Sequence, residues 1–198
     1  TIWGAHWRHV FGPKTFFEVK WTGYGAYYDL NPEVSTPGHI DLGTGAYSVS
    51  QGWYYWADRD RQQVNASVSH YAEAYGRHSF KFGVEVERSK IRNRYGMVGG
   101  LYSTDYTAYY PAGQYYAYYY SYDVDGRNER ESVFLQDAWH PNDRLTINAG
   151  VRADFVRGKS PVLGTTVYDN VNFQPRIGFA FDLTGDSKTV LKGHYGQY

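Results

Sequence analysis

Polar and apolar residues alternate almost without exception between Arg144 and Phe155. Every second position from Leu145 to Phe155 is apolar, and the positions between them carry polar side chains or glycine. This period of two predicts a β-strand with one apolar and one polar face. The strand is about twice the usual globular length of five or six residues. A strand of roughly ten residues with this alternation is typical of a transmembrane β-barrel.

The same alternation recurs along the chain and is interrupted by turn signals that divide it into hairpins. In the segment 78–92, for example, every even position from Phe80 to Val86 is apolar. Pro175 lies inside a predicted strand and removes one hydrogen-bond donor from it. The predicted strands cover residues 2–10, 15–24, 62–74, 78–92, 129–140, 144–156, 173–183 and 188–198.

Short and long connections between these strands alternate strictly. The short ones lie near residues 11, 76, 142 and 185, and the long ones cover 25–61, 93–128 and 157–172. Short periplasmic turns opposite long extracellular loops are typical of outer-membrane barrels. We therefore predict an all-β fold, an antiparallel up-and-down transmembrane β-barrel segment of about eight strands.

A soluble β-sandwich would explain the alternation equally well, because its strands also bury one face. Two features favour the membrane: the strands are long and matched in length, and aromatic residues lie near their ends. Trp139, for example, comes just before the turn at Pro141, where an interfacial aromatic girdle is expected. The other aromatic residues near strand ends are Trp3, Trp7, Trp21, Tyr195 and Tyr198.

Composition excludes several classes of function. The 20 basic and 20 acidic residues cancel, which argues against nucleic acid as a partner because phosphate binding needs a basic excess. There are no cysteines, so thiolate metal sites and cysteine nucleophiles are absent. No window approaches the 18 or so apolar residues of a transmembrane helix. A transmembrane barrel does not need such an apolar run, because half of the side chains on each strand face a polar lumen.

Candidate chemistry is sparse, and we expect no enzyme, no cofactor and no metal site. His6 and His9 are three residues apart, which on a strand places them on opposite faces. Asp123 and Asp125 resemble the start of a calcium loop, but the terminal glutamate is missing, and a loop turn is the better interpretation. The glycine-rich segment 96–100 opens no predicted helix, and no nucleophile elbow or dinucleotide fingerprint occurs.

Two hairpins resemble those of a known family. The sequence SVFLQDAWHPNDR, residues 132–144, with LTINAGVRAD after it, and FQPRIGFAFDLTGDSKTVLKGHYGQY, residues 173–198, are similar to TonB-dependent outer-membrane receptors, with the Oar-like branch nearest. The resemblance is strong over residues 129–198 and only compositional before them. It concerns barrel scaffold rather than a catalytic motif.

The resemblance implies a large barrel of about 22 strands plugged by an N-terminal domain. Residues 1–198 supply about eight strands and no recognisable plug, so we expect a partial outer-membrane β-barrel. The alternative is a complete small eight-stranded barrel with a structural role. Such barrels usually carry aromatic residues at the last and third-last positions, and Gly196 does not fit that rule although Tyr198 does.

Polar side chains on the strands are expected to face the lumen. Their roles are left open between pairing with one another across strands and lining a permeation path. The predicted lumen-facing residues are Lys81, Glu85, Arg152, Asp154, Arg176, Asp182 and Lys192.

The most distinctive connection is Leu101–Tyr122, which holds ten tyrosines and one charged residue, Asp105. Tyrosine gives a binding loop a large amphipathic contact area at low entropic cost. We expect substrate contact here, with a loop that carries no defined site as the alternative. The candidate residues are Tyr109, Tyr110, Tyr115, Tyr116 and Tyr118.

The sequence therefore predicts part of an outer-membrane receptor or transporter that takes up or handles a substrate at the surface of a Gram-negative cell. The expected partners are outer-membrane lipid, an unknown substrate, and TonB through a plug domain outside residues 1–198. A tyrosine-rich soluble β-protein that binds glycans or mediates adhesion is the alternative from another class.

Overall fold

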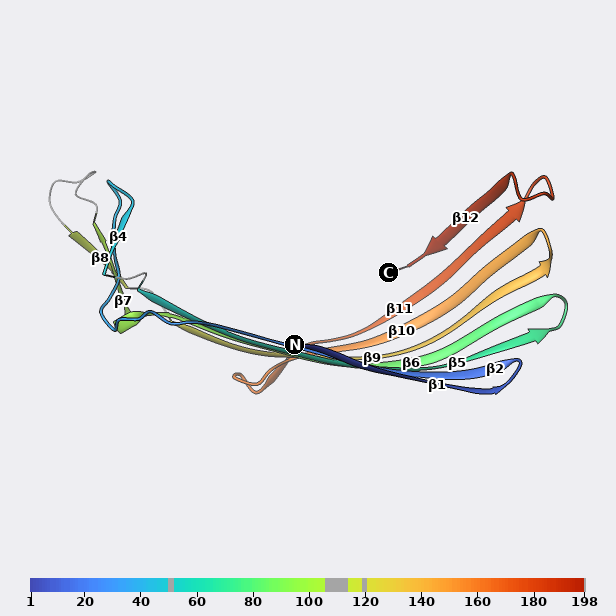
Figure 1. Ribbon diagram of the computed structural model, residues 1–198, viewed down its shortest axis with the longest axis horizontal. Coiled ribbons are helices and arrows are strands. Elements are labelled where there is room, and N and C mark those ends of the chain that lie inside the picture. The colour runs from blue at the N-terminus through green and yellow to red at the C-terminus, as the bar shows by residue number, and fades with distance from the viewer. Residues whose placement is uncertain (50–51, 106–113, 119–120, 198) are drawn as a thin grey trace.

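The chain folds into one long, curved antiparallel sheet in the computed structural model, which describes residues 1–49, 52–105, 114–118 and 121–197 (Figure 1). The eight strands of this sheet follow the order β1-β2-β5-β6-β9-β10-β11-β12. Each strand therefore pairs with its predecessor in the sheet, which makes the predicted up-and-down arrangement. Their bounds are β1 (Ile2–Gly12), β2 (Thr15–Leu30), β5 (Trp53–Glu73), β6 (Arg77–Met97), β9 (Tyr122–Asn142), β10 (Leu145–Ser160), β11 (Thr165–Asp182) and β12 (Val190–Gly196).

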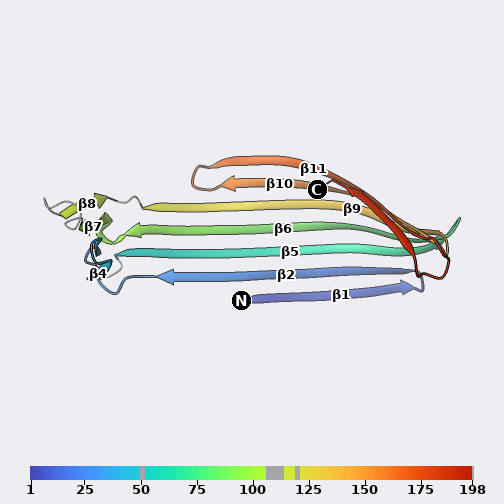
Figure 2. The ribbon, with the colours of Figure 1, turned by 90° about the horizontal axis from the view of Figure 1, so that it is seen from above.

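Four short turns gather at one end of the sheet, and the two long connections lie at the other end together with the turn between β10 and β11 (Figure 2). All four predicted short turns are confirmed by the strand bounds. The turn between β5 and β6 contains Gly76, whose φ of 118° disfavours other residues. A Cβ at Gly76 would also overlap the carbonyl oxygen of His140 on the neighbouring strand β9. Glycine is therefore required there both by its backbone angle and by the close approach of β9.

The central strands are longer than the sequence predicts. β5, β6 and β9 have 21 residues each, or about 70 Å at 3.3 Å per residue. A transmembrane strand needs only about 9–11 residues. The surplus lies on the side of the long connections, where the alternation no longer separates apolar from polar residues. Because of that loss of contrast, the sequence pattern predicts long connections where the strands in fact continue, at residues 25–30, 53–61, 93–97 and 122–128.

The predicted third long connection, 157–172, is wrong. β10 continues to Ser160 and β11 begins at Thr165, so the turn occupies only residues 161–164. The alternation of apolar and polar residues weakens here, because charged side chains such as Arg157 and Asp169 take positions that apolar residues hold further down the strands. Strict alternation of short and long connections therefore fails at this hairpin.

The two long connections contain strands of their own. They form a four-stranded sheet in the order β4-β3-β7-β8, in which β3 pairs in parallel with β7. A short 3₁₀ turn, η1 (Val98–Gly100), leads from β6 into this sheet. The two connections thus join in one body beyond the end of the large sheet (Figure 1). The bounds are β3 (His39–Asp41), β4 (Ala46–Ser48), β7 (Leu101–Asp105) and β8 (Gln114–Tyr118).

The sheet is open, and β1 and β12 each have one edge without a strand partner in the part of the chain that the structure describes. This is not the closed eight-stranded barrel of the alternative prediction. Pro175 is accommodated at the point where β12 ends. The Pro175 carbonyl accepts from the Gln197 N–H at 3.1 Å, and the position of its missing N–H lies on the same side, just past Gly196.

The described residues contain almost no hydrophobic core. Ala57 is the one buried apolar side chain among them, whereas buried polar residues include Glu85, Glu87 and Asp154. Large apolar side chains such as Phe82 and Ile177 are more than half exposed. In the described part of the chain, the sheet is a single layer with no second sheet against its apolar face (Figure 1). The soluble β-sandwich, which needs that second sheet, is therefore not the fold.

Candidate functional site

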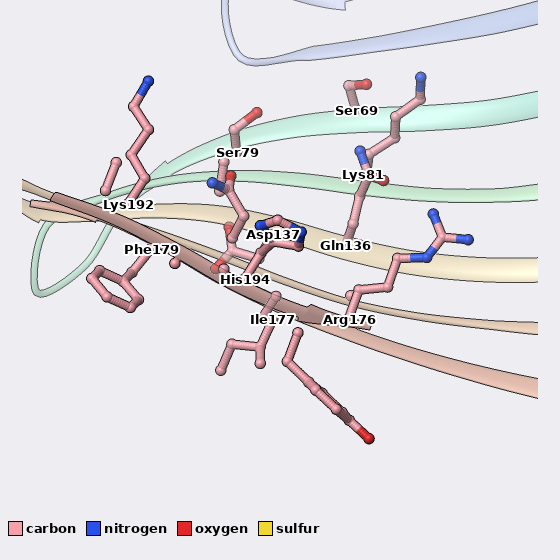
Figure 3. A pocket seen from close by; sticks show the side chains of 18 residues that line it. Ser69, Ser79, Lys81, Gln136, Asp137, Arg176, Ile177, Phe179, Lys192 and His194 are labelled. Atoms are coloured by element: carbon pink, nitrogen blue, oxygen red, sulfur yellow. The ribbon is translucent and has the colours of Figure 1, made fainter. Parts of the chain in front are cut away.

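The strand register separates the side chains into an apolar face and a polar face. Val84 lies opposite Ala66 and Val133, and the adjacent Glu85 lies opposite Asn65 and Ser132. Figure 3 shows the same division near β12, where Lys81, Arg176 and Lys192 extend to one side and Ile177 and Phe179 to the other. The sheet thus presents two chemically different surfaces over its whole width.

The apolar face is long enough to cross a bilayer core. On β10 it extends over the residues from Ile147 to Phe155, a stretch of about nine residues, and a tilted transmembrane strand needs about 9–11. Because lipid provides the apolar contacts that a second sheet would otherwise supply, the exposed valines and phenylalanines of this face need no protein cover.

Aromatic rings mark the lower border of this face, beside the short turns. The His78 ring stacks on Phe80 and Trp139, with centroid distances of 5.1 and 5.6 Å. His78 Nδ1 also contacts Asp137 at 2.6 Å, and Trp139 Nε1 donates to the Tyr75 carbonyl at 3.1 Å. Amphipathic rings with a satisfied polar atom are suited to a membrane interface. The predicted position of Trp139 beside its turn is confirmed.

A belt of ion pairs crosses the polar face at mid-height. Arg61 on β5 contacts Glu87 on β6 at 2.6 Å. Arg130 on β9 contacts Glu87 at 2.8 Å and Glu85 as well. Arg152 on β10 contacts Glu85 at 3.4 Å, so one connected network spans four strands.

The belt continues onto β11 through the side-chain amide of Gln174. Arg152 also contacts Asp154 at 2.7 Å and donates to the Ser132 hydroxyl at 2.7 Å. Asp154 then accepts from the Gln174 amide at 2.9 Å. Glu85, Glu87 and Asp154 are all less than a tenth exposed, so their charges require these partners. The belt therefore ties neighbouring strands together and leaves little free charge at this height.

Below the belt the polar face changes to a basic hollow of about 620 Å³. Its lining includes Lys81, Arg176, Lys192 and His194, together with small residues such as Ser69. The cationic side chains rise from β6, β11 and β12 on one side of the sheet (Figure 3). This hollow carries an excess of positive charge that the belt above it does not.

Asp182 has a local role in the turn between β11 and β12. Its carboxylate accepts from the backbone N–H groups of Thr184, Gly185 and Ser187 at 3.2, 2.9 and 2.9 Å. The Arg144 guanidinium donates to the Asp182 carbonyl at 2.8 Å. The side chain is thus occupied in shaping the turn.

All of the predicted lumen-facing residues share the polar face, but the structure divides them into three groups. Glu85, Arg152 and Asp154 belong to the belt. Lys81, Arg176 and Lys192 line the hollow, and Asp182 organises a turn. Their action on a permeating substrate stays a prediction.

Above the belt, towards the long connections, the polar face carries a row of aromatic rings that sequence reasoning missed. Tyr55 lies opposite Tyr95, which in turn lies opposite Tyr122. Tyr95 contacts Tyr122 at a centroid distance of 5.4 Å and Trp53 at 5.9 Å, and Tyr28 contacts Tyr55 at 5.7 Å. We call Tyr28, Trp53, Tyr55, Tyr95 and Tyr122 the aromatic row.

The aromatic row lines a hollow of about 640 Å³ that also includes Arg59. The signal that could have found it was aromatic residues at alternate positions, as in Trp53 and Tyr55. This signal is weak because both residues lie in the predicted connection 25–61, where alternation is not expected. Rings gathered over an open hollow can stack on planar or ring-shaped ligands.

The predicted tyrosine contacts lie in the other long connection. Tyr109 and Tyr110 fall outside the described residues. Tyr115, Tyr116 and Tyr118 lie on β8, where the backbone register places them opposite Thr104, Ser103 and Leu101. Their contact with substrate stays a prediction.

Neither a membrane-spanning helix nor a metal-binding cluster occurs in the described residues. Among residues 1–49, 52–105, 114–118 and 121–197, no helix has the length and apolar character to cross a membrane. The same residues contain no group of three histidine or acidic side chains that could hold a metal ion.

A family profile described as TonB dependent receptor-like, beta-barrel, matches residues 2–198. The chain therefore belongs to the family of TonB-dependent receptor β-barrels. This membership places it in the outer membrane of a Gram-negative bacterium, as predicted. Its known relatives and structural neighbours are receptors and transporters.

One curated relative is the TonB-dependent transporter Oar of Myxococcus xanthus, which is 28% identical over 158 residues. That alignment covers 70% of this chain and 15% of the transporter. The chain thus spans about a seventh of the length of that relative.

Solved structures support the fold. The P. aeruginosa receptor FpvA, solved with heterologous pyoverdines, matches with a TM-score of 0.66 and 13% identity, over 92% of this chain and 24% of that one. The copper transporter OprC matches with a TM-score of 0.64 and 15% identity, over 98% of this chain and 29% of that one. Because the sequence identities are this low, the two matches show the shared barrel fold alone.

Proposed function

We propose that this chain forms part of the wall of a non-enzymatic outer-membrane receptor that takes up a scarce or bulky substrate. The energy for uptake is supplied by TonB, through a plug domain outside residues 1–198. The observation that carries this proposal is the order of surfaces along the polar face, from the aromatic row through the ion-pair belt to the basic hollow.

The aromatic row is the proposed point of first contact with substrate. It lies at the end of the sheet with the long connections, which faces the cell exterior in this family architecture. Its rings provide stacking surface, and Arg59 in the same hollow provides a positive charge. This combination favours a substrate that has a ring or planar group together with an anionic group.

Uptake can be measured before the substrate is known. The host strain, a strain with the full receptor gene deleted and a strain depleted of TonB are grown in the same complex medium. Mass spectrometry of the spent media then identifies compounds that only the first strain removes. The proposal predicts at least one such compound. Equal depletion by all three strains would contradict receptor function.

The same assay tests the aromatic row. A triple Tyr55→Ala, Tyr95→Ala and Tyr122→Ala variant of the full receptor should remove the identified compound at least tenfold more slowly. Tyr75→Ala is the control, because Tyr75 is exposed in a short turn at the opposite end. Replacement of Tyr109, Tyr110, Tyr115, Tyr116 and Tyr118 by serine tests the second tyrosine group in the same way.

A further inference from the structure

The basic hollow has a floor of small side chains and a rim of cations. Residue pairing across the sheet places Lys81 on β6 and Arg176 on β11 in one row, with Gln136 and Gly150 between them. The next row towards the short turns contains small residues, which are Ser79, Ala138, Asn148 and Gly178. This arrangement leaves an open volume of about 620 Å³, which lies in the usual range of small-molecule sites.

Positive charge in the basic hollow lacks carboxylate partners. Lys81 and Lys192 form no ion pair among the residues that the structure describes. Asp137 is the one carboxylate among the described lining residues, and His78 holds it at 2.6 Å. Arg176 donates to a neutral side-chain amide oxygen at 3.0 Å. The hollow therefore has an excess of positive charge, which attracts an anion.

The belt directly above the basic hollow shows how cations on this face are otherwise accommodated. On β10, Arg152 contacts Asp154 at 2.7 Å and Glu85 on β6 at 3.4 Å, so carboxylates compensate its charge. Pairs of opposite charge across strands stabilise a sheet. Lys81 and Lys192 depart from this pattern, and strand pairing therefore does not explain their charges.

The basic hollow is too far from the aromatic row to belong to the same site. Lys81 and Tyr95 both lie on β6, fourteen residues apart, which is about 46 Å along the strand. Glu85 and Glu87 of the belt lie between them on the same strand. A small-molecule substrate held by the aromatic row therefore cannot contact Lys81, and it meets the hollow only after it has passed the belt.

The donors of the basic hollow define the chemistry of its ligand. The planar guanidinium of Arg176 matches a carboxylate or a phosphate, and the ammonium groups of Lys81 and Lys192 act as point charges with three donors each. All three side chains extend to the same side of the sheet (Figure 3). Ser79 and Asn148 on the floor add neutral polar groups. The fitting ligand is an anion, either a carboxylate or a phosphate.

We propose that the basic hollow is a second binding position for the anionic group of the substrate, on the short-turn side of the belt. This inference rests on the proposed function, in which the aromatic row makes the first contact. The hollow draws the anionic group past the belt, because a cleft lined by charge of one sign concentrates its counter-ion. The substrate thus has two successive positions along the wall.

The site can be tested on the full-length receptor in neutral-detergent micelles with two probes that differ in one group. Pyridoxal 5′-phosphate and pyridoxal share a ring and an aldehyde, but only the first carries a phosphate. The aldehyde condenses with a lysine amine, with loss of water, to an imine that borohydride reduces to a stable label. Peptide mass spectrometry gives the labelled fraction of each lysine. Lys14, which is exposed in a short turn, is the reference.

The ratio of labelling by pyridoxal 5′-phosphate to labelling by pyridoxal should be at least about tenfold higher at Lys81 and Lys192 than at Lys14. Arg176→Gln should lower this ratio at Lys81 by about threefold. Equal ratios at the three lysines would overturn the proposal. Failure of both probes to label Lys81 and Lys192 would also overturn it, because the hollow would then be covered by the plug domain.

Competition for this label distinguishes the substrate from a free anion. The compound identified by the uptake assay should protect Lys81 and Lys192 from pyridoxal 5′-phosphate at a lower concentration than inorganic phosphate does. Equal or better protection by inorganic phosphate would assign the hollow to a free anion and would overturn the proposal.

Uptake kinetics separate the basic hollow from the aromatic row. Lys81→Gln with Lys192→Gln should lower the maximal uptake rate about tenfold and leave the half-saturating concentration unchanged, because first contact is made elsewhere. The control, Lys14→Gln with Lys188→Gln, removes the same charge from two short turns. This control and the charge-conserving Lys81→Arg with Lys192→Arg should transport like the unaltered receptor. An unchanged maximal rate in the folded test variant would overturn the proposal.

Two further measurements keep this result specific. Heat-dependent mobility on gels confirms that each variant is folded, and vancomycin sensitivity of the cells reports whether the plug still seals the barrel. Raised sensitivity in the test variant would assign the hollow to plug seating and would overturn the proposal. If no compound requires both the receptor and TonB for removal, the proposed function fails, whereas the labelling ratio still decides whether the hollow binds an anion.

Discussion

Arg130 on β9 holds Glu87 on β6 at 2.8 Å, and the same guanidinium also contacts Glu85 two residues away. One cation thus compensates two carboxylates that are each less than a tenth exposed. Both carboxylates have a second partner, Arg61 for Glu87 and Arg152 for Glu85. Arg130 is therefore the centre of the belt.

Replacement of Arg130 should destabilise the barrel more than replacement of an exposed arginine. Arg130→Met leaves two buried carboxylates with one partner each, and we expect the free energy of unfolding to fall by about 2 kcal/mol. Arg94→Met is the control, because both side chains of the Arg94–Asp123 pair are more than half exposed. This substitution should lower the free energy of unfolding by less than about 1 kcal/mol. Urea-induced unfolding of the full receptor in lipid vesicles measures both. Equal losses would show that the belt is no stronger than a surface pair.

The carboxylate of Asp182 shapes the last turn. Asp182→Ala removes the acceptor of three backbone N–H groups, those of Thr184, Gly185 and Ser187, and should cost about 1–2 kcal/mol. Asp143→Ala in another short turn is the matched control, because Asp143 is 95% exposed and makes one surface ion pair. Asp143→Ala should change the free energy of unfolding by no more than about 0.5 kcal/mol. The unfolding assay used for Arg130 compares them, and a neutral Asp182→Ala would refute this role.

The same turn should loosen in acid. The ammonium of Lys188 beside Asp186, together with the Thr184 hydroxyl, holds the pKa of the Asp186 carboxyl below its ordinary value of about 3.9. A carboxyl whose pKa is lowered on folding stabilises the fold at pH above its unfolded value, and this contribution is lost as the pH falls through the folded value. Amide exchange of residues 183–189, corrected for intrinsic rates, should therefore be faster at pH 3 than at pH 6.

A Lys188→Gln variant gives the control for this pH dependence. Removal of the ammonium takes away the first cause of the lowered pKa, so loosening should begin at a higher pH than in the unaltered receptor. Identical exchange profiles for the two proteins would show that Asp186 does not govern the turn. Exchange of the Pro13–Lys14 turn, which contains no carboxylate, should not follow this pattern.

Sequence alternation predicted the strands wherever the two faces meet different solvents. Between Leu145 and Phe155 one face meets lipid and the other the lumen, so the period of two is sharp. Beyond Arg157 both faces are polar, and the strand continues through backbone pairing that leaves no contrast in hydropathy. The boundary that the sequence marked was therefore the edge of the apolar band rather than the end of the strand.

The candidate site was predictable only in part for the same reason. The alternation of polar and apolar positions along the strands predicts that Glu85 and Arg152 face the lumen. It does not indicate which carboxylate contacts which guanidinium. That choice depends on the register between strands that are distant in sequence, such as β6 and β10, which are separated in the sheet by β9. The sequence does not reveal the aromatic row, because its members come from the ends of four strands, β2, β5, β6 and β9, where hydropathy no longer alternates.

Register also explains why a glycine occupies the middle of β6. Gly83 lies opposite Phe134, whose ring lies where a Cβ of residue 83 would be, and the Ala66 carbonyl oxygen is 2.8 Å from that position. Gly83→Val should therefore displace the Phe134 ring and cost about 1–3 kcal/mol. Gly25→Val is the control, because nothing lies within 4 Å of a Cβ there, and valine favours strands. Thermal unfolding of the folded receptor, followed by gel mobility, should separate the two variants clearly, and equal melting temperatures would mean that the Phe134 ring moves aside without cost.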